Sequence, residues 1–444
     1  MEPKRLLLTI GVCILFVVVW TWGTAKFAEW QGWDLNKRAE STQNDTDAEV
    51  PGPGLGDDLP APGIGETPAV TPDDPTPDAP ATQGSTDPGE NLATDGQIVV
   101  AEQGTPQILT LGSTDTEDPT FSLGIDVNTR GAGVDQIVLN SYAQSTRSDD
   151  RYTFQQPYTI SPDTTRPLST RSVQLLGKTV RLDDVVWKVD QANTDHRQAL
   201  LYVDLADANG PLVRVKKFIK VFEVDEQIGD NKYEHGGYEI RVTQSLKNLR
   251  SSSLQARMTL VGPNGPPSDL EQGYDRYVVL GRTGKNGVEY DPISVDNFDE
   301  DDPTDTFTFR DSDDGDLVWA GQGSIYFNAI LRPTTGTTPK LAQVVGEAVD
   351  PKSTFREVTT RFVTETLELE GGQETNITFA GYFGPKSDLL ENDHYSQASI
   401  GYDRTLVSPF GCTWCVFEPV VDILKWLLNI FYFLLRDWGM AIIG

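Results

Sequence analysis

The sequence has little of three things on which many enzymes and nucleic-acid-binding proteins depend: cysteine, histidine and basic charge. It holds three cysteines and three histidines in 444 residues. Lysine and arginine number 36 against 66 for aspartate and glutamate, which gives a formal net charge of −30. A surface of that sign repels phosphate backbones, so we expect no nucleic-acid partner. So few cysteines exclude a disulfide-dense scaffold.

Motifs that carry chemistry are also scarce. His196, His235 and His394 have no partners at metal-ligand spacing, and we expect them to be surface or packing residues. No nucleophile elbow, phosphate loop or dinucleotide fingerprint occurs in the sequence. Residues 311–316 resemble a calcium loop, but the glycine comes one position early and Gln322 stands where a bidentate glutamate belongs. We therefore predict a protein that is not an enzyme and uses no cofactor or metal.

Two of the cysteines form a Cys-Thr-Trp-Cys motif at Cys412 and Cys415. This spacing is typical of redox motifs, but the motif lacks the βαβ context of an oxidoreductase, and no second pair exists for zinc. In an oxidising compartment the simplest interpretation is a local disulfide between Cys412 and Cys415.

An apolar run near the N-terminus predicts attachment to a membrane. Residues 6–22 carry no charge, and Lys4 and Arg5 precede them. About 18–20 apolar residues span a bilayer, and the basic flank favours an N-terminus in the cytoplasm. A cleaved signal peptide is the alternative, because residues 23–25 form a passable cleavage site. The run is long for a signal core, so we predict a transmembrane anchor over residues 1–33.

The next segment, residues 34–105, predicts a disordered linker. Ten prolines occur from Pro51 to Pro88. The segment has 15 acidic residues and only two basic residues, Lys37 and Arg38. Proline, glycine and charge of one sign keep such a chain extended and unable to form a core.

Residues 106–405 have the pattern of a large antiparallel β-sandwich. Phe121, Leu123, Ile125 and Val127 alternate with small or polar residues, which is the period of a half-buried strand. Similar runs occupy residues 180–189, 199–205, 212–224, 238–242, 254–261, 325–331, 362–369 and 375–383. Asn209-Gly210 and Asn286-Gly287 predict tight turns. The predicted fold class is therefore mainly β, with many short strands outside the membrane.

Residues 406–437 predict an amphipathic helix that lies in the membrane interface. Its polar residues fall within about 60° of one another on a helix and are Glu418, Asp422, Lys425, Asn429 and Arg436. A narrow polar stripe on an apolar helix favours the interface, while a core helix or a transmembrane span remain alternatives. Residues 438–444 read as the start of a second transmembrane helix that is cut off, which predicts a fragment.

Several segments, in this order along the chain, resemble the YidC family of membrane-protein insertases. They include Asn128-Thr-Arg-Gly131-Ala-Gly133 with Ile137-Val-Leu139, Ala208-Asn209-Gly210, residues 238–248, Val318-Trp319-Ala320 with Tyr326-Phe327-Asn-Ala329 and Pro333, Tyr382-Phe-Gly384-Pro385-Lys386, Pro419, Leu424-Lys425-Trp426, and Trp438-Gly439 with Ile442-Ile443.

The resemblance implies a mutarotase-like β-supersandwich flanked by the two membrane segments. It implies a place in the bacterial cytoplasmic (inner) membrane, with the main domain in the periplasm. The implied partners are nascent membrane proteins, the Sec translocon and the lipid bilayer. In the family the insertase groove, with its arginine, comes from a later helical bundle, and this sequence stops before it. We therefore expect no catalytic residue. A membrane-anchored carbohydrate-binding protein and a structural β-sandwich protein of the envelope remain alternatives.

Overall fold

The structure, a computed structural model, describes most of the predicted β domain and little of the flanking segments. The described residues are 97–145, 148–160, 163–228, 233–267, 276–295, 306–310, 315–334, 340–348, 358–406, 427–428, 430–433 and 436. The chain divides into two compact units, residues 1–84 and 85–444, and all described residues belong to the second unit. The predicted anchor at residues 1–33 lies outside the described residues.

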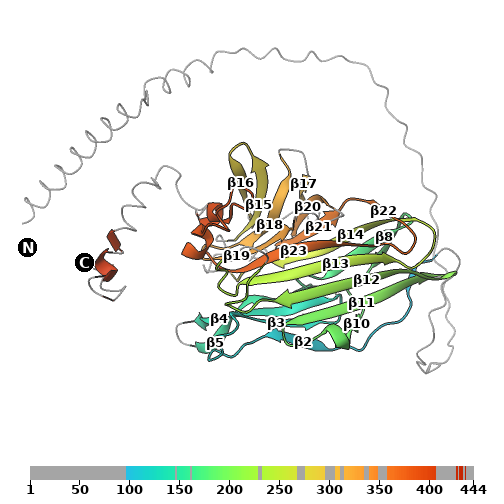
Figure 1. Ribbon diagram of the computed structural model, residues 1–444, viewed down its shortest axis with the longest axis horizontal. Helices are drawn as coiled ribbons and strands as arrows, with labels where there is room; N and C mark the ends of the chain where they lie inside the picture. Colours follow the sequence, from blue (N-terminus) through green and yellow to red (C-terminus); the bar gives the residue numbers. More distant parts are fainter. Residues whose placement is uncertain are drawn as a thin grey trace, which may run out of the picture. The chain divides into compact units, whose positions relative to one another are not determined.

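The described strands form four sheets, and every strand pairing is antiparallel. The largest has ten strands in the order β1 (Val99–Val100), β11 (Gln198–Asp207), β12 (Gly210–Val221), β13 (Glu239–Asn248), β23 (Glu374–Pro385), β19 (Phe327–Pro333), β18 (Leu317–Gly323), β15 (Tyr277–Gly284) and β16 (Gly287–Ser294), with β10 (Lys188–Val189) paired to β11. We call it the large sheet. The prediction of a mainly β, antiparallel domain is confirmed (Figure 1).

Three smaller sheets complete the fold. The seven-stranded sheet runs β17 (Thr306–Arg310), β20 (Leu341–Ala348), β21 (Val358–Thr364), β14 (Leu254–Asn264), β8 (Thr170–Leu175) and β9 (Lys178–Arg181), with β22 (Leu367–Leu369) on β14. The four-stranded sheet is β2 (Ile108–Gly112), β3 (Leu123–Asn128), β4 (Gly133–Ser145) and β5 (Ser148–Gln155), and the last pair is β6 (Tyr158–Ile160) and β7 (Asp163–Thr165). Short 3₁₀ turns stand at η1 (Gln191–Asn193), η3 (Asp388–Glu391) and η4 (Tyr402–Leu406).

Alternating burial explains why the large sheet forms. Along β11, β12 and β13 every second residue is buried, as a strand with two different faces requires. The buried face joins residues of the four-stranded and seven-stranded sheets in one apolar cluster, which includes Ile125, Val215, Val242, Met258 and Phe379. The four-stranded and seven-stranded sheets therefore pack against this inner face of the large sheet.

The two predicted turns join neighbouring strands. Ala208 and Asn209 form the turn between β11 and β12, and Gly210 follows it with a φ of 95°. Gly287 begins β16 with a φ of 118° after the turn that ends β15. Only glycine adopts such a positive φ without steric cost, which is why both turns contain it.

Two features of the fold differ from the sequence pattern. The run 180–189 is not one strand, because the chain leaves the sheet after β9 and turns so that Leu182 and Trp187 both enter the core. Order also begins before residue 106, because β1 pairs with β11 and places Val99 opposite Ala206. The large sheet thus takes up residues at the end of the predicted 34–105 linker.

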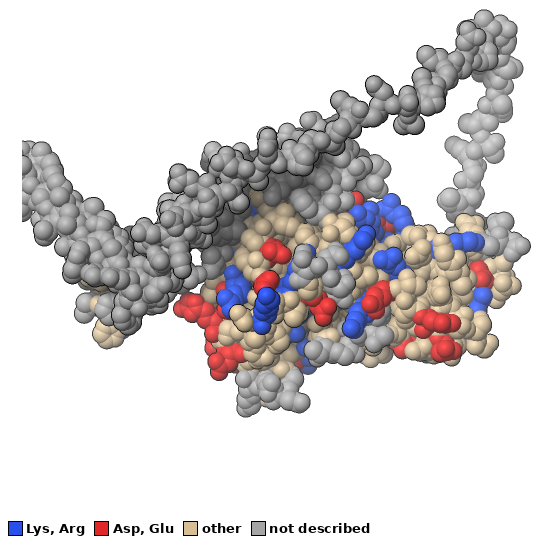
Figure 2. All heavy atoms as spheres, turned by 90° about the horizontal axis from the view of Figure 1, so that it is seen from above, with Lys and Arg blue, Asp and Glu red and all other residues tan. Residues whose placement is uncertain are grey.

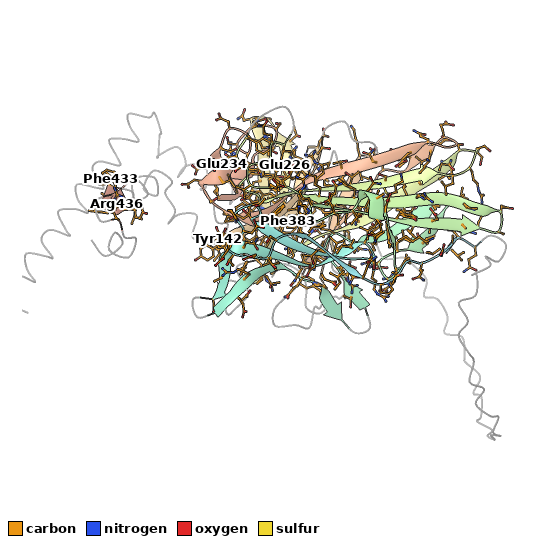
Figure 3. All side chains as sticks on the ribbon, turned by 60° about the horizontal axis from the view of Figure 1, so that its bottom comes forward. Tyr142, Glu226, Glu234, Phe383, Phe433 and Arg436 are labelled. Atoms are coloured by element: carbon orange, nitrogen blue, oxygen red, sulfur yellow. The ribbon has the colours of Figure 1, made fainter. Side chains whose placement is uncertain are left out.

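Near the C-terminus, Leu427, Leu428 and residues 430–433 are helical, and Arg436 has a positive φ of 53°. The Phe433 side chain is 74% exposed, and Figure 3 labels it beside Arg436. Within the described ranges, no helix has the length and apolar character needed to cross a bilayer.

Candidate functional site

The outer face of the large sheet is covered at one end by the chain segment that follows β23. We call residues 388–406 the C-terminal layer. The indole Nε1 of Trp319 donates to the carbonyl of Ile400 at 2.6 Å, and Asn328 Nδ2 donates to Thr405 Oγ1 at 2.6 Å. Both sheet residues lie on strands β18 and β19, so these bonds fix the layer to the middle of the sheet. The layer also has its own apolar cluster, separate from the main core.

Aromatic rings make most of the contact between the layer and the sheet. Tyr382 of β23 meets Tyr395 edge-on at 5.5 Å between ring centroids, and Tyr395 stacks on Tyr402 at 5.6 Å. Trp319 meets Tyr402 edge-on at 5.7 Å. Offset stacks and edge-to-face pairs at these distances are favourable beyond the area that they bury. The layer is therefore held by a packed aromatic cluster as well as by hydrogen bonds.

A buried carboxylate lies at the centre of this cluster. Glu239, the first residue of β13, accepts hydrogen bonds from Tyr233 Oη at 2.9 Å and from Tyr395 Oη at 2.7 Å. Burial, and then the charge of Glu239, raises the pKa of both tyrosines, so their hydroxyl groups stay protonated donors. Buried charge is tolerated where it is hydrogen-bonded in this way.

Two of the three histidines meet at this end of the sheet. His394 stacks on Tyr233, with 3.4 Å between the ring centroids and 6° between the planes. Burial, then the charges of Arg332 and His235, lowers the pKa of His394 to about 4, so it is neutral at pH 7. His235 is fully buried and meets Tyr233 edge-on at 6.0 Å, whereas His196 is exposed. No sequence spacing could have shown that His235 and His394 converge.

His235 is tied to its own loop by both ring nitrogens. Its Nε2 lies 2.7 Å from the carbonyl of Glu226, and its Nδ1 accepts from the amide of Gly237. The side-chain Nδ2 of Asn392 donates to the backbone carbonyl of Glu234 at 2.7 Å and joins this loop to the C-terminal layer. Figure 3 shows Glu226 and Glu234 near one another at the end of the domain that also carries Tyr142.

A row of basic residues crosses the outer face next to the tyrosine cluster. In the strand register Lys220 stands opposite Arg241, Arg241 opposite Ala380, and Ala380 opposite Arg332. Lys220 forms an ion pair with Glu226. Of the described residues, none forms an ion pair with Arg241 or Arg332.

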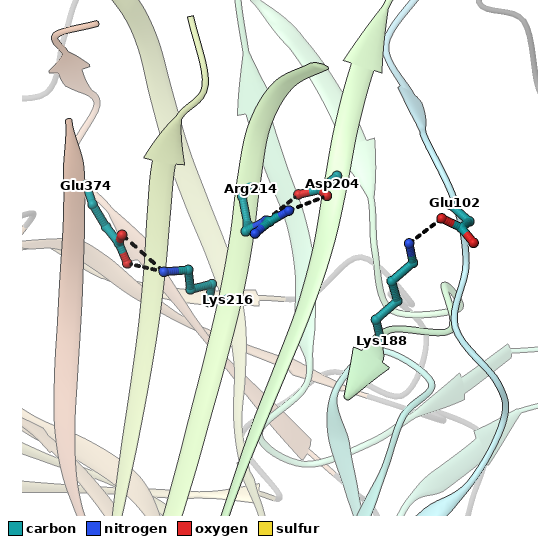
Figure 4. Close-up of polar contacts among 6 residues, drawn as sticks. All are labelled: Glu102, Lys188, Asp204, Arg214, Lys216 and Glu374. Carbon is teal, nitrogen blue, oxygen red and sulfur yellow. Dashed lines mark hydrogen bonds and ion pairs between the residues drawn. The ribbon is translucent and has the colours of Figure 1, made fainter. Parts of the chain in front are cut away.

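Farther from the C-terminal layer, the outer face carries ion pairs instead. Figure 4 shows Arg214 with Asp204, Lys216 with Glu374, and Lys188 with Glu102. The space-filling view in Figure 2 shows acidic and basic side chains interspersed over the described part of one face. Such pairs on exposed strands contribute little to stability but keep a sheet face soluble.

Each carboxylate oxygen of Glu239 accepts one tyrosine hydroxyl, so the two bonds hold Tyr233 and Tyr395 around it. Among the residues that the structure describes, no group of histidine, cysteine, aspartate and glutamate side chains could hold a metal ion.

Of the predicted site residues, only Arg436 is described, and its side chain is exposed. Glu418, Asp422, Lys425 and Asn429 of the polar stripe, and the pair Cys412 and Cys415, lie outside the described residues. The stripe and the disulfide stay predictions.

Two of the segments that carried the family resemblance, residues 318–333 and 382–386, meet at the C-terminal layer. Trp319 and Asn328 bond to it directly, and Tyr382 lies beneath it. The amide of Lys386 donates to the carbonyl of Tyr326 at 2.7 Å beside the same strand ends. Residues 60 positions apart in the chain thus build one structural unit.

Comparison with known proteins shows which family the β domain resembles. A family model described as the YidC periplasmic domain matches residues 117–421. The membrane protein insertase YidC of Pseudoalteromonas translucida (strain TAC 125) is 24% identical over 222 residues, which are 48% of this chain and 34% of that protein. The chain thus matches about a third of the length of this relative.

Similar solved structures include a galactose mutarotase related enzyme from Lactobacillus acidophilus and a galactose mutarotase-like protein from Lactobacillus casei ATCC 334. Both are 11% identical, with TM-scores of 0.38 and 0.39. They cover 63% of this chain, and 97% and 100% of their own chains. Likenesses this loose carry no inference about function. The family match spans more than half of the sequence, and this chain therefore belongs to the YidC family, whose periplasmic domain it contains.

Proposed function

We propose that this chain is the periplasmic part of a membrane-protein insertase in the bacterial inner membrane, and that it assists the Sec translocon with nascent membrane proteins. The family match over residues 117–421 carries this proposal. Insertion itself requires a polar, water-filled path inside the bilayer. The β domain instead presents a folded surface outside the membrane, so its role is to contact partners and not to catalyse a reaction.

The two ends of the domain have different roles in this proposal. Val99 and Val100 enter the large sheet beside the β11–β12 turn. At the other end, the last described residue of the β domain is Leu406, in the layer that covers Glu239 and Tyr382. Strand β13 links the two ends and has ten residues, which span about 30 Å. If the segment after Leu406 lies in the membrane interface, the layer end faces the membrane and the entry end points away.

This orientation requires a long N-terminal tether. The chain must travel from the membrane to Val99 at the far end of the sheet, at least the length of β13. If the linker is disordered, as the sequence pattern predicts, its roughly 65 residues would have a root-mean-square span of about 45 Å, which is enough for this distance.

Contact with lipid fits the described C-terminal residues. Leu427, Leu428 and residues 430–433 are helical, and Leu427, which is 39% exposed, lies on the helix face opposite to the predicted polar stripe. Large apolar side chains of an amphipathic helix insert between headgroups and acyl chains. We propose that this helix holds the layer end against the bilayer.

Site-specific photo-crosslinking in bacterial membranes tests the proposal. A photoreactive residue replaces Tyr326, which is 61% exposed beside the layer, or Leu176, which is 54% exposed at the β8–β9 turn. Residue 176 is the matched control, because its neighbour Gln255 lies at the Asn248 end of the sheet. We expect adducts with Sec translocon subunits or nascent membrane proteins from position 326 alone. Equal adducts from both positions, or none from either, would reject the proposed orientation.

A further inference from the structure

Two arginines on the outer face of the large sheet, Arg241 and Arg332, form no ion pair with a described residue, in a protein where acids outnumber bases by 66 to 36. Eleven other basic residues among the described ranges form ion pairs. Glu239 lies two residues before Arg241 on the same face of β13, and its single negative charge offsets only one of the two arginines. Arg241 and Arg332 therefore leave a local positive charge on the outer face.

The strand register places these two side chains on either side of a small residue. Arg241 on β13 and Arg332 on β19 are both opposite Ala380 of the central strand β23. Neighbouring strands lie about 4.8 Å apart, so the two arginine backbones are about 10 Å apart. Ala380 carries only a methyl group and is 6% exposed, and Arg241 and Arg332 flank it on the two neighbouring strands.

Several nitrogen atoms in this region lack a hydrogen-bond partner. The Nε atoms of Arg241 and Arg332 are buried and unbonded, and so is Nε2 of His394. The charge of Arg332 acts on His394, and both arginines act on Tyr233, which places all four groups in one neighbourhood. Buried donors are nearly always satisfied in folded proteins, so the two arginine Nε–H groups favour an acceptor at this place, and Nε2 of His394 can donate to it in one of its two tautomers.

The neighbouring residues favour a ligand with several oxygens. Arg241 also lies over the ring of Phe222, 5.4 Å from its centroid, which holds the guanidinium in place. Beyond the arginine row, Thr243 Oγ1 and Thr378 Oγ1 are 3.0 Å apart and offer hydroxyl groups on the same face. A phosphate group presents three or more oxygens and can accept from two guanidinium groups on opposite sides.

We propose that Arg241 and Arg332, assisted by His394, bind a phosphate group above Ala380 of the large sheet. A carboxylate has only two oxygens and pairs well with one guanidinium group. Phosphate therefore fits better a site that has a guanidinium group on each of two sides. The phosphate belongs either to a phospholipid headgroup or to a free phosphate compound, since both present the same chemistry. His394 belongs to the C-terminal layer and the two arginines belong to the sheet. A bound phosphate would therefore contact both.

Calorimetric titration of the full chain in detergent with inorganic phosphate tests the site. We expect binding that weakens at least about tenfold in Arg332→Gln and in Arg241→Gln, because each loses a charge-assisted contact. Arg214→Gln is the matched control, since Arg214 lies on the same sheet face and already bonds to Asp204. It should change the affinity less than about twofold. An equal loss in the control, absence of phosphate binding, or equal binding of acetate would overturn the proposal.

A second measurement keeps the test sharp if an arginine variant misfolds. In the unaltered protein, the imidazole resonances of His394 should shift on addition of phosphate, while those of the exposed His196 should not. Unchanged His394 resonances at saturating phosphate would also overturn the proposal. Dihexanoyl phosphatidic acid distinguishes the sources: tighter binding than inorganic phosphate identifies a lipid headgroup, and equal binding identifies a free phosphate compound.

Discussion

The two faces of the central strands β13 and β23 are built by different rules. On the inner face Ile240, Val242 and Phe379 join a cluster shared by three sheets. On the outer face Glu239 lies under the C-terminal layer, while the residues toward Asn248 stand between exposed ion pairs. The same backbones thus carry a continuous apolar core on one side and a polar, partly covered surface on the other.

The comparison teaches that the inner face is held together by buried apolar area and the covered part of the outer face by individual contacts. Apolar burial is proportional to area and needs no particular partner, so the inner face tolerates similar apolar residues. The outer layer depends on individual bonds, such as those of Tyr233 and Tyr395 to Glu239. A change to one partner there leaves a buried polar group unsatisfied.

The largest effect is expected on the inner face. Phe379→Ala should lower the free energy of unfolding by about 3–5 kcal/mol, because it removes a ring that is fully packed in the core. Urea denaturation followed by fluorescence measures the change. Thr378→Ala, the next residue on the opposite face, is the control and should cost about 1 kcal/mol. Equal costs would show that the faces do not differ.

The second-largest effect on stability is expected from Lys217, a buried lysine on the otherwise apolar inner face. Lys217 is fully buried, its Nζ donates to the carbonyl of Leu168, and its register partner Gln244 is also buried. Burial lowers the pKa of Lys217 from 10.5 to about 7. Between these values the unfolded chain binds more protons than the folded one, so stability rises as pH increases from about 7 to about 10.5.

Lys217→Met should remove this rise and raise stability at pH 7 by about 2–4 kcal/mol, because the charged form no longer opposes folding. Lys216→Met is the matched control, since Lys216 lies on the outer face and pairs with Glu374. It should keep the rise. Urea midpoints measured from pH 6 to 10 test both variants. A persistent slope in Lys217→Met would mean that another group causes it.

A smaller and more local effect is expected in the outer layer. Tyr395→Phe removes one of the two hydrogen bonds to buried Glu239 and should cost about 1–3 kcal/mol. Amide hydrogen exchange should speed up in residues 388–406 more than in β12. Tyr326→Phe, at an exposed site, should leave exchange unchanged. Uniformly faster exchange after Tyr395→Phe would show that the layer and core unfold together.

The smallest effect is expected for the exposed ion pairs. Arg214 and Asp204 bond through two nitrogen–oxygen contacts of 2.7 and 2.8 Å, with both side chains partly exposed. A double-mutant cycle with Arg214→Gln and Asp204→Asn should give a coupling of about 0.2–1 kcal/mol that falls in 1 M salt. A coupling above about 2 kcal/mol would contradict the prediction, because it would show that exposed ion pairs of the outer face also stabilise the fold.

Local pattern predicted several strands of the β domain, while others, such as β8, β15 and β20, were not among the predicted runs. The alternation at residues 199–205 and 254–261 matches β11 and β14, because a sheet with one buried face imposes a period of two. The glycines of both predicted turns follow from the φ that those turns require. The run 362–369 was predicted as one strand, and the chain instead breaks between β21 and β22. Nothing in its composition marks that break.

By itself the sequence determined the antiparallel β class, the two turns and the resemblance to the insertase family, since these depend on neighbouring residues and their order. Only the tertiary structure decided that Glu239 meets Tyr395 and that Arg241 and Arg332 bracket Ala380. These residues stand up to 156 positions apart. Their meeting depends on which strands pair and on which face the chain covers afterwards, and long-range pairing leaves no trace in local periodicity.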